Sequence, residues 1–244
     1  MKIAAVIPAR LNATRLPRKL LADLCGKPVL QRTYEAAIAT GLFPEVIIAT
    51  DSDEIREIME TAGATVVMSH KVHESGSDRI AEAVSDKDID VIINIQGDEP
   101  FVNSKLLKNL IKVFQNKDEN VRVASVMREI TEASLIADPN VVKVVTDLNY
   151  NALYFSRHSV PFKRDPINET PVYQHIGVYA FRKEALMSFT SWPQSPLEIA
   201  EKLEQLRYLE HGVPIKMVMT DVVGISIDVP EDLERAREYW EKKY

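Results

Sequence analysis

The 244-residue sequence has little cysteine, little glycine and no surplus of positive charge. Its single cysteine, Cys25, cannot form an internal disulfide, which is typical of a reducing compartment. Thirty Lys and Arg residues against 36 Asp and Glu residues give a net charge of −6. No nucleic-acid partner is expected, because such proteins normally carry a basic surplus. Any polyanion must therefore bind at a local cluster of cations.

Apolar runs that could cross a bilayer are also missing, since about 20 residues are needed. The apolar stretch in MKIAAVIPAR is too short for the hydrophobic region of a signal peptide. We therefore expect a cytoplasmic location and no membrane partner. A hydrophobic content of 45% excludes intrinsic disorder and predicts a chain that buries a core.

The first half of the sequence alternates short β-branched runs with amphipathic stretches. Strands are predicted at residues 3–7, 46–49, 65–68 and 91–95, and helices at 28–40, 53–62, 78–84 and 104–115. The β-branched runs lack polar alternation, which indicates strands buried on both faces. The sequence therefore predicts an α/β fold with an open, mostly parallel sheet and right-handed crossovers.

The second half is less regular. Strands are predicted at residues 123–127, 141–146, 172–181, 215–219 and 224–228, and helices at 196–211 and from about 230. No repeat or Gly/Ser-rich linker separates two domains. Residues 1–244 are therefore predicted to form one domain, with a sub-region at about residues 120–220.

A cluster of cations follows the first predicted strand and contains Arg10, Arg15, Arg18 and Lys19. Ligands of open parallel sheets bind at the carboxyl ends of the strands. A bound polyphosphate would relieve the repulsion among these charges, and the alternative is a solvated basic loop. We favour phosphate binding because the cluster directly follows a buried strand. The glycine patterns of common phosphate loops are absent, so side-chain cations must take over that role.

Two aspartates follow later strands and are candidate metal ligands. Asp98 lies in NIQGDEP after the fourth strand, and Asp228 lies in SIDVPED after a short one. Mg²⁺ prefers one or two carboxylates together with substrate phosphates. A cap or turn role explains Asp98 equally well, and Asp228 is a ligand only if the fold brings it to the same sheet edge. Glu231 and Asp232 fall in the first turn of the next helix, where acidic residues favour the helix dipole.

Further residue patterns suggest a second substrate. The segment HESGSDR opens a helix with small residues, where a flat ring or a phosphate can approach backbone N–H groups. Arg157 follows two aromatic residues and is suited to gripping a carboxylate. On a strand, His175 and Tyr179 would share one face, although a satisfied core histidine is the more common situation.

Taken together, these segments resemble the 3-deoxy-manno-octulosonate cytidylyltransferase (CMP-Kdo synthetase) family. The matching segments run through nearly the whole chain, from PARLNATRLPRKLL and ATD through HESGSDR, NIQGDEP, DPNVVKVV, YFSR, QHIGVYAF and SPLEIAEKLEQLRYLEHG to IDVPEDLE. The resemblance implies a Rossmann-like fold of the nucleotide-diphospho-sugar transferase type, with a smaller sub-region for sugar binding and dimerisation. The implied activity is transfer of CMP from CTP to the anomeric hydroxyl of Kdo, releasing pyrophosphate, for lipopolysaccharide biosynthesis. Mg²⁺ is the implied cofactor, and a homodimer is the implied assembly.

The resemblance also implies roles for individual residues. Catalysis would depend on Lys19, Arg10 and Asp98, and Mg²⁺ would be held by Asp98 and Asp228. The nucleotide would be bound by Arg10, Arg15, Lys19, Ser75, Arg79 and Gln96. The sugar acid would be bound by Gln96, Arg157, His175, Tyr179, Glu204 and Gln205.

Four residues depart from the family pattern, which usually has serine at Ala13, glycine at Arg18, valine at Ile227 and threonine at Val229. Two alternatives to Kdo cytidylyl transfer are considered. One is a cytidylyltransferase for another keto-acid sugar, such as a sialic acid or an amino-substituted Kdo. The other is a nucleotide-binding protein without catalysis, which the retention of both aspartates disfavours.

Overall fold

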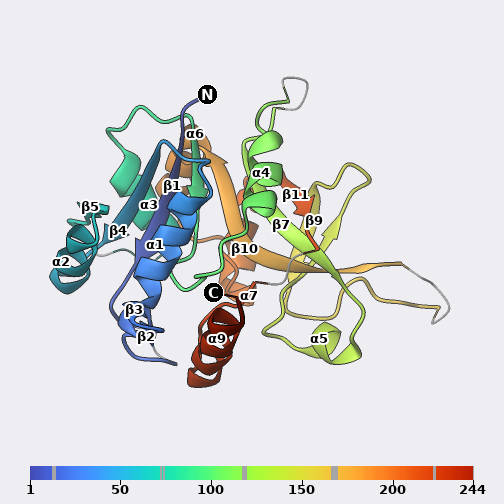
Figure 1. Ribbon diagram of the computed structural model, residues 1–244. Coiled ribbons are helices and arrows are strands. Elements are labelled where there is room, and N and C mark those ends of the chain that lie inside the picture. The colour runs from blue at the N-terminus through green and yellow to red at the C-terminus, as the bar shows by residue number, and fades with distance from the viewer. Residues whose placement is uncertain are drawn as a thin grey trace. The chain divides into compact units, whose positions relative to one another are not determined.

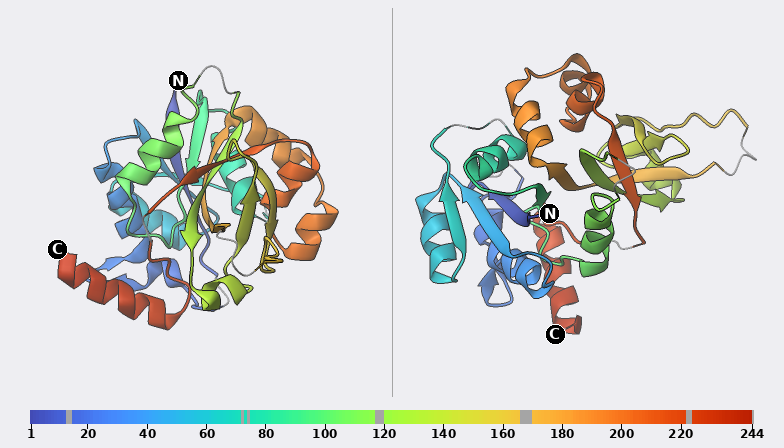
Figure 2. Two further views of the ribbon diagram at one scale, coloured as in Figure 1. Left: turned by 90° about the vertical axis from the view of Figure 1, so that its right-hand side faces the viewer. Right: turned by 90° about the horizontal axis from the view of Figure 1, so that it is seen from above.

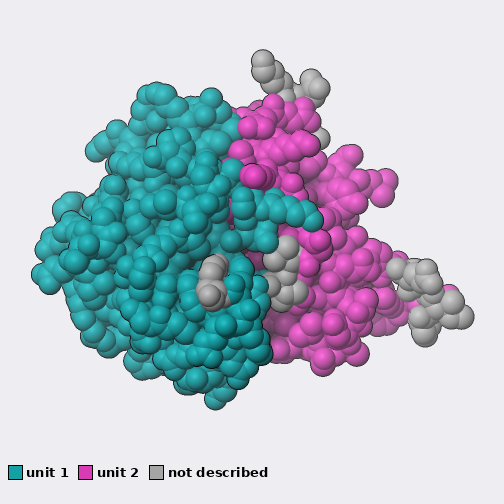
Figure 3. Space-filling view, in the orientation of Figure 1, with its two compact units in different colours: residues 1–105, 223–244 teal, residues 106–222 magenta. Residues whose placement is uncertain are grey.

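The computed structural model describes residues 1–12, 15–71, 73, 75–116, 120–165, 170–221 and 224–243. Ala13, one of the departures from the family pattern, lies outside the described residues. The chain divides into two compact units, residues 1–105 with 223–244 and residues 106–222 (Figure 3). Within the described residues, no helix is both long enough and apolar enough to span a membrane. The organisation of residues 1–244 as a single domain stays a prediction.

The first unit is built on four parallel strands in the order β6–β1–β4–β5. These strands are β1 (Ile3–Ala9), β4 (Glu45–Thr50), β5 (Thr65–Met68) and β6 (Val91–Asn94). In the ladder, Ala5 of β1 lies opposite Val46 on one side and Ile93 on the other. Because all four strands run in the same direction, their carboxyl ends lie at one edge of the sheet. The predicted α/β fold with a mostly parallel sheet is confirmed.

Helices connect these strands in the predicted order: α1 (Val29–Ala39), α2 (Asp53–Thr61) and α3 (Gly76–Val84). Both α1 and α3 pack against β1 and β4, and they cover opposite faces of the sheet (Figures 1 and 2). The apolar side of α1 is buried, because its small and apolar residues recur at helical spacing. These crossovers leave the carboxyl edge of the sheet to the loops.

Short elements and the last helix complete the first unit. The 3₁₀ helix η1 (Lys19–Leu21) leads into a hairpin of β2 (Asp23–Leu24) and β3 (Lys27–Pro28), and α9 (Pro230–Lys243) ends the unit. In α9, Leu233 and Ala236 pack with Leu24, Val29 and Ile227 in one buried cluster. The prediction of a strand at 224–228 is wrong, because this segment joins no ladder. Its Ile227 amide instead donates to the carbonyl of Asp98.

The second unit has a mixed sheet. Its strands are β7 (Val123–Ile130), β8 (Lys143–Thr146), β9 (Ala152–Ser156), β10 (Val172–Arg182) and β11 (Ile215–Met219). Strand β7 lies between antiparallel β10 and parallel β11, while β8 pairs with both β10 and β9. Its helices are α5 (Ala133–Ala137), α6 (Lys183–Ser191), α7 (Pro196–Glu201) and α8 (Gln205–Glu210), and α4 (Ser104–Lys112) begins two residues before the unit boundary.

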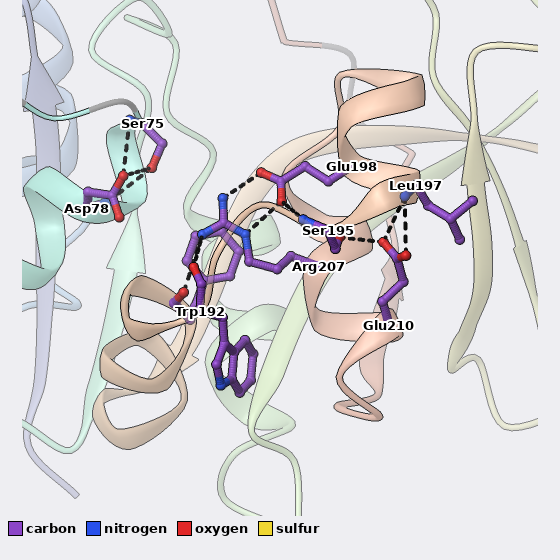
Figure 4. Close-up of polar contacts among 9 residues, drawn as sticks. Ser75, Asp78, Trp192, Ser195, Leu197, Glu198, Arg207 and Glu210 are labelled. Atoms are coloured by element: carbon purple, nitrogen blue, oxygen red, sulfur yellow. Dashed lines mark hydrogen bonds and ion pairs between the residues drawn. The ribbon is translucent and has the colours of Figure 1, made fainter.

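The prediction of one helix at 196–211 is wrong, because the chain breaks between α7 and α8. Lys202 has a φ of 54°, in the left-handed region, and ends α7. Two nitrogens of Arg207 in α8 donate to the two carboxylate oxygens of Glu198 in α7, at 2.7 and 2.5 Å (Figure 4). The apolar spacing is compatible with a continuous helix, but the left-handed Lys202 interrupts it, and this ion pair links the two short helices across the break.

Candidate active site

The ammonium group of Lys19 lies between the two aspartates singled out as metal ligands. Its Nζ donates to Oδ2 of Asp98 and to Oδ1 of Asp228, the second at 2.9 Å. Lys19 begins η1, Asp98 follows β6, and Asp228 precedes α9. The fold of the first unit therefore brings together three charges from distant parts of the sequence. It places Asp228 at the same sheet edge as Asp98, which is the condition for both to bind one metal ion.

Partial burial strengthens this cluster. The side chains of Lys19 and Asp98 are 18% and 16% exposed, against 39% for Asp228. Burial opposes the charged form of Lys19, but the two carboxylates outweigh burial and raise its pKa. The guanidinium of Arg15 adds a second cation 3.6 Å from Oδ1 of Asp228. At neutral pH, the cluster thus balances two carboxylates with two cations.

Backbone contacts hold the two aspartate segments against each other. The Ile227 amide donates to the carbonyl oxygen of Asp98 at 3.0 Å. On the other side, the buried Thr33 hydroxyl donates to the carbonyl of Gly97 at 2.9 Å. A Cβ at Gly97 would lie 3.3 Å from the Pro8 carbonyl oxygen and 3.2 Å from two leucine side chains. A glycine therefore lets the turn that carries Asp98 pack closely on the end of β1 without displacing these neighbours.

Glu99 adds a further carboxyl group next to the pair. Burial raises the pKa of Glu99 to about 7, and the negative charges of Asp98 and Asp228 add to the rise. Near neutral pH, this group is therefore only partly ionised. The charge at this edge of the sheet is set mainly by the two aspartates and the cations opposite them.

The donor set suits a hard divalent cation. Oxygens of Asp98 and Asp228 both bond to the single atom Nζ of Lys19, so they already converge on one positive charge. Two carboxylates are what Mg²⁺ commonly takes from a protein when substrate phosphates supply further oxygens. Among the described residues, no group of three or more His, Cys, Asp or Glu side chains is placed to hold a metal. The residues present therefore fit Mg²⁺ bound jointly by protein and substrate.

Two more cations of the predicted phosphate loop, Arg10 and Arg18, and the predicted nucleotide-binding residue Gln96 lie in segments that follow β1 or β6. Arg10 directly follows β1 and is exposed. Gln96 follows β6, and its carbonyl accepts from the Glu99 amide at 3.1 Å. Arg18, where the family usually has glycine, has a φ of 58° and pairs with Glu54 of α2. The left-handed backbone explains why glycine suits this position.

The predicted base-binding residues Ser75 and Arg79 occupy structured positions. Ser75 caps α3, because its Oγ accepts from the Asp78 amide at 3.1 Å and the Asp78 carboxylate accepts in return from Ser75 (Figure 4). Arg79 is buried and donates to Asp51 at 2.9 Å and to Ser69 at 3.2 Å. Asp51 follows β4 and Ser69 follows β5. Arg79 therefore ties together the loops at the carboxyl ends of these two strands.

In the second unit, Arg157 follows β9 and interacts with the end of α7. Its guanidinium donates to the carbonyl oxygens of Glu201 at 2.8 Å, Pro139 at 3.0 Å and Lys202 at 3.4 Å. Its amide donates to the Glu201 carboxylate at 2.9 Å. The predicted carboxylate-binding arginine therefore has three backbone carbonyls as partners in this structure, and its role toward a sugar acid stays a prediction.

His175 and Tyr179 come together on β10, as their spacing predicted, despite a register shift between Ile176 and Tyr179. Their ring centroids are 5.4 Å apart, and a His175 nitrogen lies 2.9 Å from the Ser125 hydroxyl. Burial lowers the pKa of His175 to about 3. Burial, the charge of Glu204 and the nearby Tyr208 raise the pKa of Tyr179 well above its ordinary value. Both side chains are therefore uncharged at neutral pH.

Glu204 and Gln205 lie at the start of α8. Glu204 is exposed at the cap position, and Gln205 is buried. The amide nitrogen Nε2 of Gln205 is a buried donor with no hydrogen-bond partner among the described residues. A buried, unsatisfied donor costs free energy, and a ligand that brings an acceptor would remove that cost.

Several residues that shape the two units were not singled out from the sequence. Lys143 is fully buried in β8 and donates to three backbone carbonyls, among them that of Arg157 at 2.7 Å. A lysine within the β-branched run VVKVV was a usable signal for such a role. Thr33 and Glu201 carried no comparable signal, because their partners lie far away in the sequence.

The chain is similar to known proteins over its whole length. The family model described as cytidylyltransferase matches residues 4–217. A 3-deoxy-manno-octulosonate cytidylyltransferase of Flavobacterium johnsoniae is 55% identical over 97% of this chain and 98% of its own. A protein of the same name from Christiangramia forsetii is 50% identical over 97% of this chain and 96% of its own.

Solved structures agree with these sequence relatives. A CMP:2-keto-3-deoxy-manno-octonic acid synthetase, solved in complex with CTP, superposes with a TM-score of 0.94 at 34% identity, covering all of both chains. A 4-diphosphocytidyl-2C-methyl-D-erythritol synthase from Anaerococcus prevotii superposes with a TM-score of 0.65 over 98% of each chain. At 17% identity, the second match concerns the fold alone.

Proposed function

The chain belongs to the 3-deoxy-manno-octulosonate cytidylyltransferase family, and we propose that it transfers CMP from CTP to the anomeric hydroxyl of Kdo and releases pyrophosphate. One observation carries this conclusion. Asp98 and Asp228, which are 130 positions apart, meet at the ammonium of Lys19 at the carboxyl end of a parallel sheet. The product would serve lipopolysaccharide biosynthesis.

We propose Mg²⁺ as the cofactor, held by Asp98 and Asp228. When bound, such an ion neutralises negative charge on phosphate oxygens. The convergence of both carboxylates on Nζ of Lys19 supports this assignment, since a site that already attracts one cation suits another. Hard oxygen donors are the ligands that this ion prefers.

The cations of the first loop would bind and orient the triphosphate. Lys19 and Arg15 contact the aspartate pair in this structure, and phosphate oxygens offer them alternative partners. With Arg10, which follows β1, they would stabilise the charge on the departing pyrophosphate as the sugar oxygen attacks the α-phosphorus. Fixed cations act with little reorganisation, which is the main source of such electrostatic stabilisation. Ser75, Arg79 and Gln96 are proposed to hold the rest of the nucleotide.

Residues of the second unit are proposed to bind the sugar acid, namely Arg157, His175, Tyr179, Glu204 and Gln205. The unsatisfied Nε2 of Gln205 supports this proposal, because a sugar hydroxyl or carboxylate would supply the missing acceptor. His175 and Tyr179 are uncharged at neutral pH and can contribute hydrogen bonds without adding a buried charge.

A homodimer in the cytoplasm is also proposed. The second unit exposes large apolar side chains, with Leu148 100%, Phe162 87% and Leu153 62% exposed. Contact with a second copy would remove such apolar surface from water. Sedimentation at micromolar concentration would measure the mass, and a single species of one chain would contradict the dimer.

Product identification tests the proposed reaction. The protein is incubated with CTP and Kdo, a sialic acid or an amino-substituted Kdo, with Mg²⁺ or with a chelator, and the products are analysed by mass spectrometry. We expect CMP-Kdo and pyrophosphate, only when Mg²⁺ is present. Preferential use of another sugar acid would contradict the substrate assignment. Calorimetric binding of CTP without any pyrophosphate release would indicate a protein that binds the nucleotide but does not catalyse its transfer.

A further inference from the structure

Asp232 is a buried carboxylate in the first turn of α9, next to the proposed metal site. Only 8% of the residue is exposed. Its Oδ2 accepts from the Asp228 amide at 2.9 Å and from the Val229 amide at 3.0 Å. Its Oδ1 accepts from the guanidinium of Arg235. A charged group with so little exposure needs such partners, because burial without them is costly.

These hydrogen bonds do more than cap the N-terminus of α9. Val229 precedes α9 and has no side-chain oxygen, so it cannot cap the first amides as serine or threonine would. Asp232 is the third residue of the helix and reaches back past Val229 to the amide of Asp228. The contact therefore fixes the backbone of the residue that is the proposed metal ligand.

Asp228 is held from both sides along the backbone. The amide of Ile227 donates to the carbonyl of Asp98 at 3.0 Å, and the amide of Asp228 donates to Asp232. Ile227 is fully buried in the cluster that anchors α9. The Asp228 side chain itself is 39% exposed, so surrounding packing does little to select its position. The direction in which its carboxylate points therefore comes from the backbone together with its hydrogen bond from Lys19 and its ion pair with Arg15.

The structure assigns to Asp232 the role of a positioning residue that sets the Asp228 carboxylate opposite Asp98. The inference rests on the proposed function, because it requires that the two aspartates bind a divalent cation together. Both oxygens of Asp232 are engaged with protein donors, so Asp232 orients the ligand without becoming one. Partners of this kind typically change metal affinity by about 10- to 100-fold when they are removed.

Titration of Mn²⁺ into the full chain, followed by calorimetry with and without CTP, tests this role. We expect Asp232→Ala to weaken Mn²⁺ binding about tenfold and to raise the Mg²⁺ concentration needed for half-maximal turnover. Asp232→Asn keeps one acceptor oxygen, so its Mn²⁺ affinity should lie between those of Asp232→Ala and the unmodified protein. This variant replaces Asp232→Ala in the test if the alanine variant does not fold. Glu231→Ala, which removes an exposed acid from the same turn, should bind Mn²⁺ as the unmodified protein does.

A second substitution separates positioning from helix stability. Val229→Thr introduces a hydroxyl that can cap α9, but it cannot bond to the Asp228 amide in place of Asp232. In the Asp232→Ala background, it should recover part of the lost thermal stability and none of the lost Mn²⁺ affinity. Recovery of both, or unchanged Mn²⁺ affinity in folded Asp232→Ala and Asp232→Asn, would overturn the inference. Undiminished Mn²⁺ binding by Asp228→Ala would instead overturn the metal assignment itself.

Discussion

Nζ of Lys19 donates a hydrogen bond to Oδ1 of Asp228 at 2.9 Å, across 209 positions of sequence. The same ammonium bonds to Asp98, so one lysine compensates both proposed metal ligands. In this arrangement, a divalent cation and Lys19 are alternative sources of positive charge for the pair. The lysine therefore affects metal affinity as well as phosphate binding.

Replacing Lys19 by methionine separates these two effects. Without the ammonium, Arg15 beside Asp228 is the one cation of the cluster that is left for two carboxylates, and we expect Lys19→Met to bind Mn²⁺ several-fold more tightly than the unmodified protein in the absence of CTP. Turnover should fall by two or more powers of ten, about the loss caused by removing one stabilising donor. Calorimetry and a pyrophosphate-release assay measure the two quantities. Lys27→Met removes a lysine that pairs with Glu35 instead, and should change neither.

Gly97 is expected to tolerate a side chain poorly. A Cβ there would lie 3.3 Å from the carbonyl oxygen of Pro8, and a backbone atom cannot move aside cheaply. Gly97→Ala should lower the free energy of unfolding by about 1–3 kcal/mol, as overpacking does, and reduce turnover by displacing Asp98. Urea unfolding checks the first effect. Gly224→Ala is the control, since among the described residues nothing lies within 4 Å of a Cβ at that position.

Local patterns explain why much of the first unit was predictable from the sequence. The β-branched runs of β1, β4, β5 and β6 and the periodic helices between them are properties of short segments, and the parallel sheet follows from the alternation of strands and helices. The order of the strands was not predicted. Asp98 was found because it follows a predicted strand, whereas Asp228 was found at the end of a predicted strand, 224–228, that the structure does not contain. The hairpin β2–β3 was missed. In the structure its turn residues Cys25 and Gly26 both have positive φ, at 52° and 87°, and the glycine was the sequence signal for such a turn.

The remaining features depend on partners that only the fold brings together. The break between α7 and α8 follows from the pairing of Glu198 with Arg207 and from the left-handed Lys202, and lysine carries no signal for that backbone conformation. Asp232 was predicted to favour the helix dipole, because its position in a first turn is all that the sequence shows. Its bonds to the amides before the helix became visible only in the structure.

Acid should destabilise the protein partly through His175. Burial lowers the pKa of His175 to about 3 in the folded chain, whereas an unfolded histidine titrates near 6.5. The unfolded chain therefore binds the extra proton first, so this stability is present above pH 6.5 and lost as the pH falls below it. At pH 5 the loss from this group is about 2 kcal/mol. Urea unfolding at pH 7 and pH 5 should show a smaller difference for His175→Asn than for the unmodified protein, whereas His158→Asn, at an exposed position, should keep the full difference.

The ion pair of Glu198 and Arg207 should be a major determinant of stability in the second unit. The side chains are 4% and 6% exposed. Arg207 also donates to the carbonyl of Trp192 at 3.2 Å (Figure 4) and to that of Phe189 at 3.3 Å. Arg207→Met leaves a buried carboxylate without its counter-charge, and we expect a loss of about 3–5 kcal/mol in the free energy of unfolding. The exposed pair of Arg56 and Asp53 provides the matched control, because Arg56→Met should cost less than about 1 kcal/mol. Adding Glu198→Gln to Arg207→Met removes the stranded charge, so it should recover part of the loss. If the double variant is instead no more stable than Arg207→Met, the cost comes from lost packing and carbonyl contacts and not from the uncompensated charge.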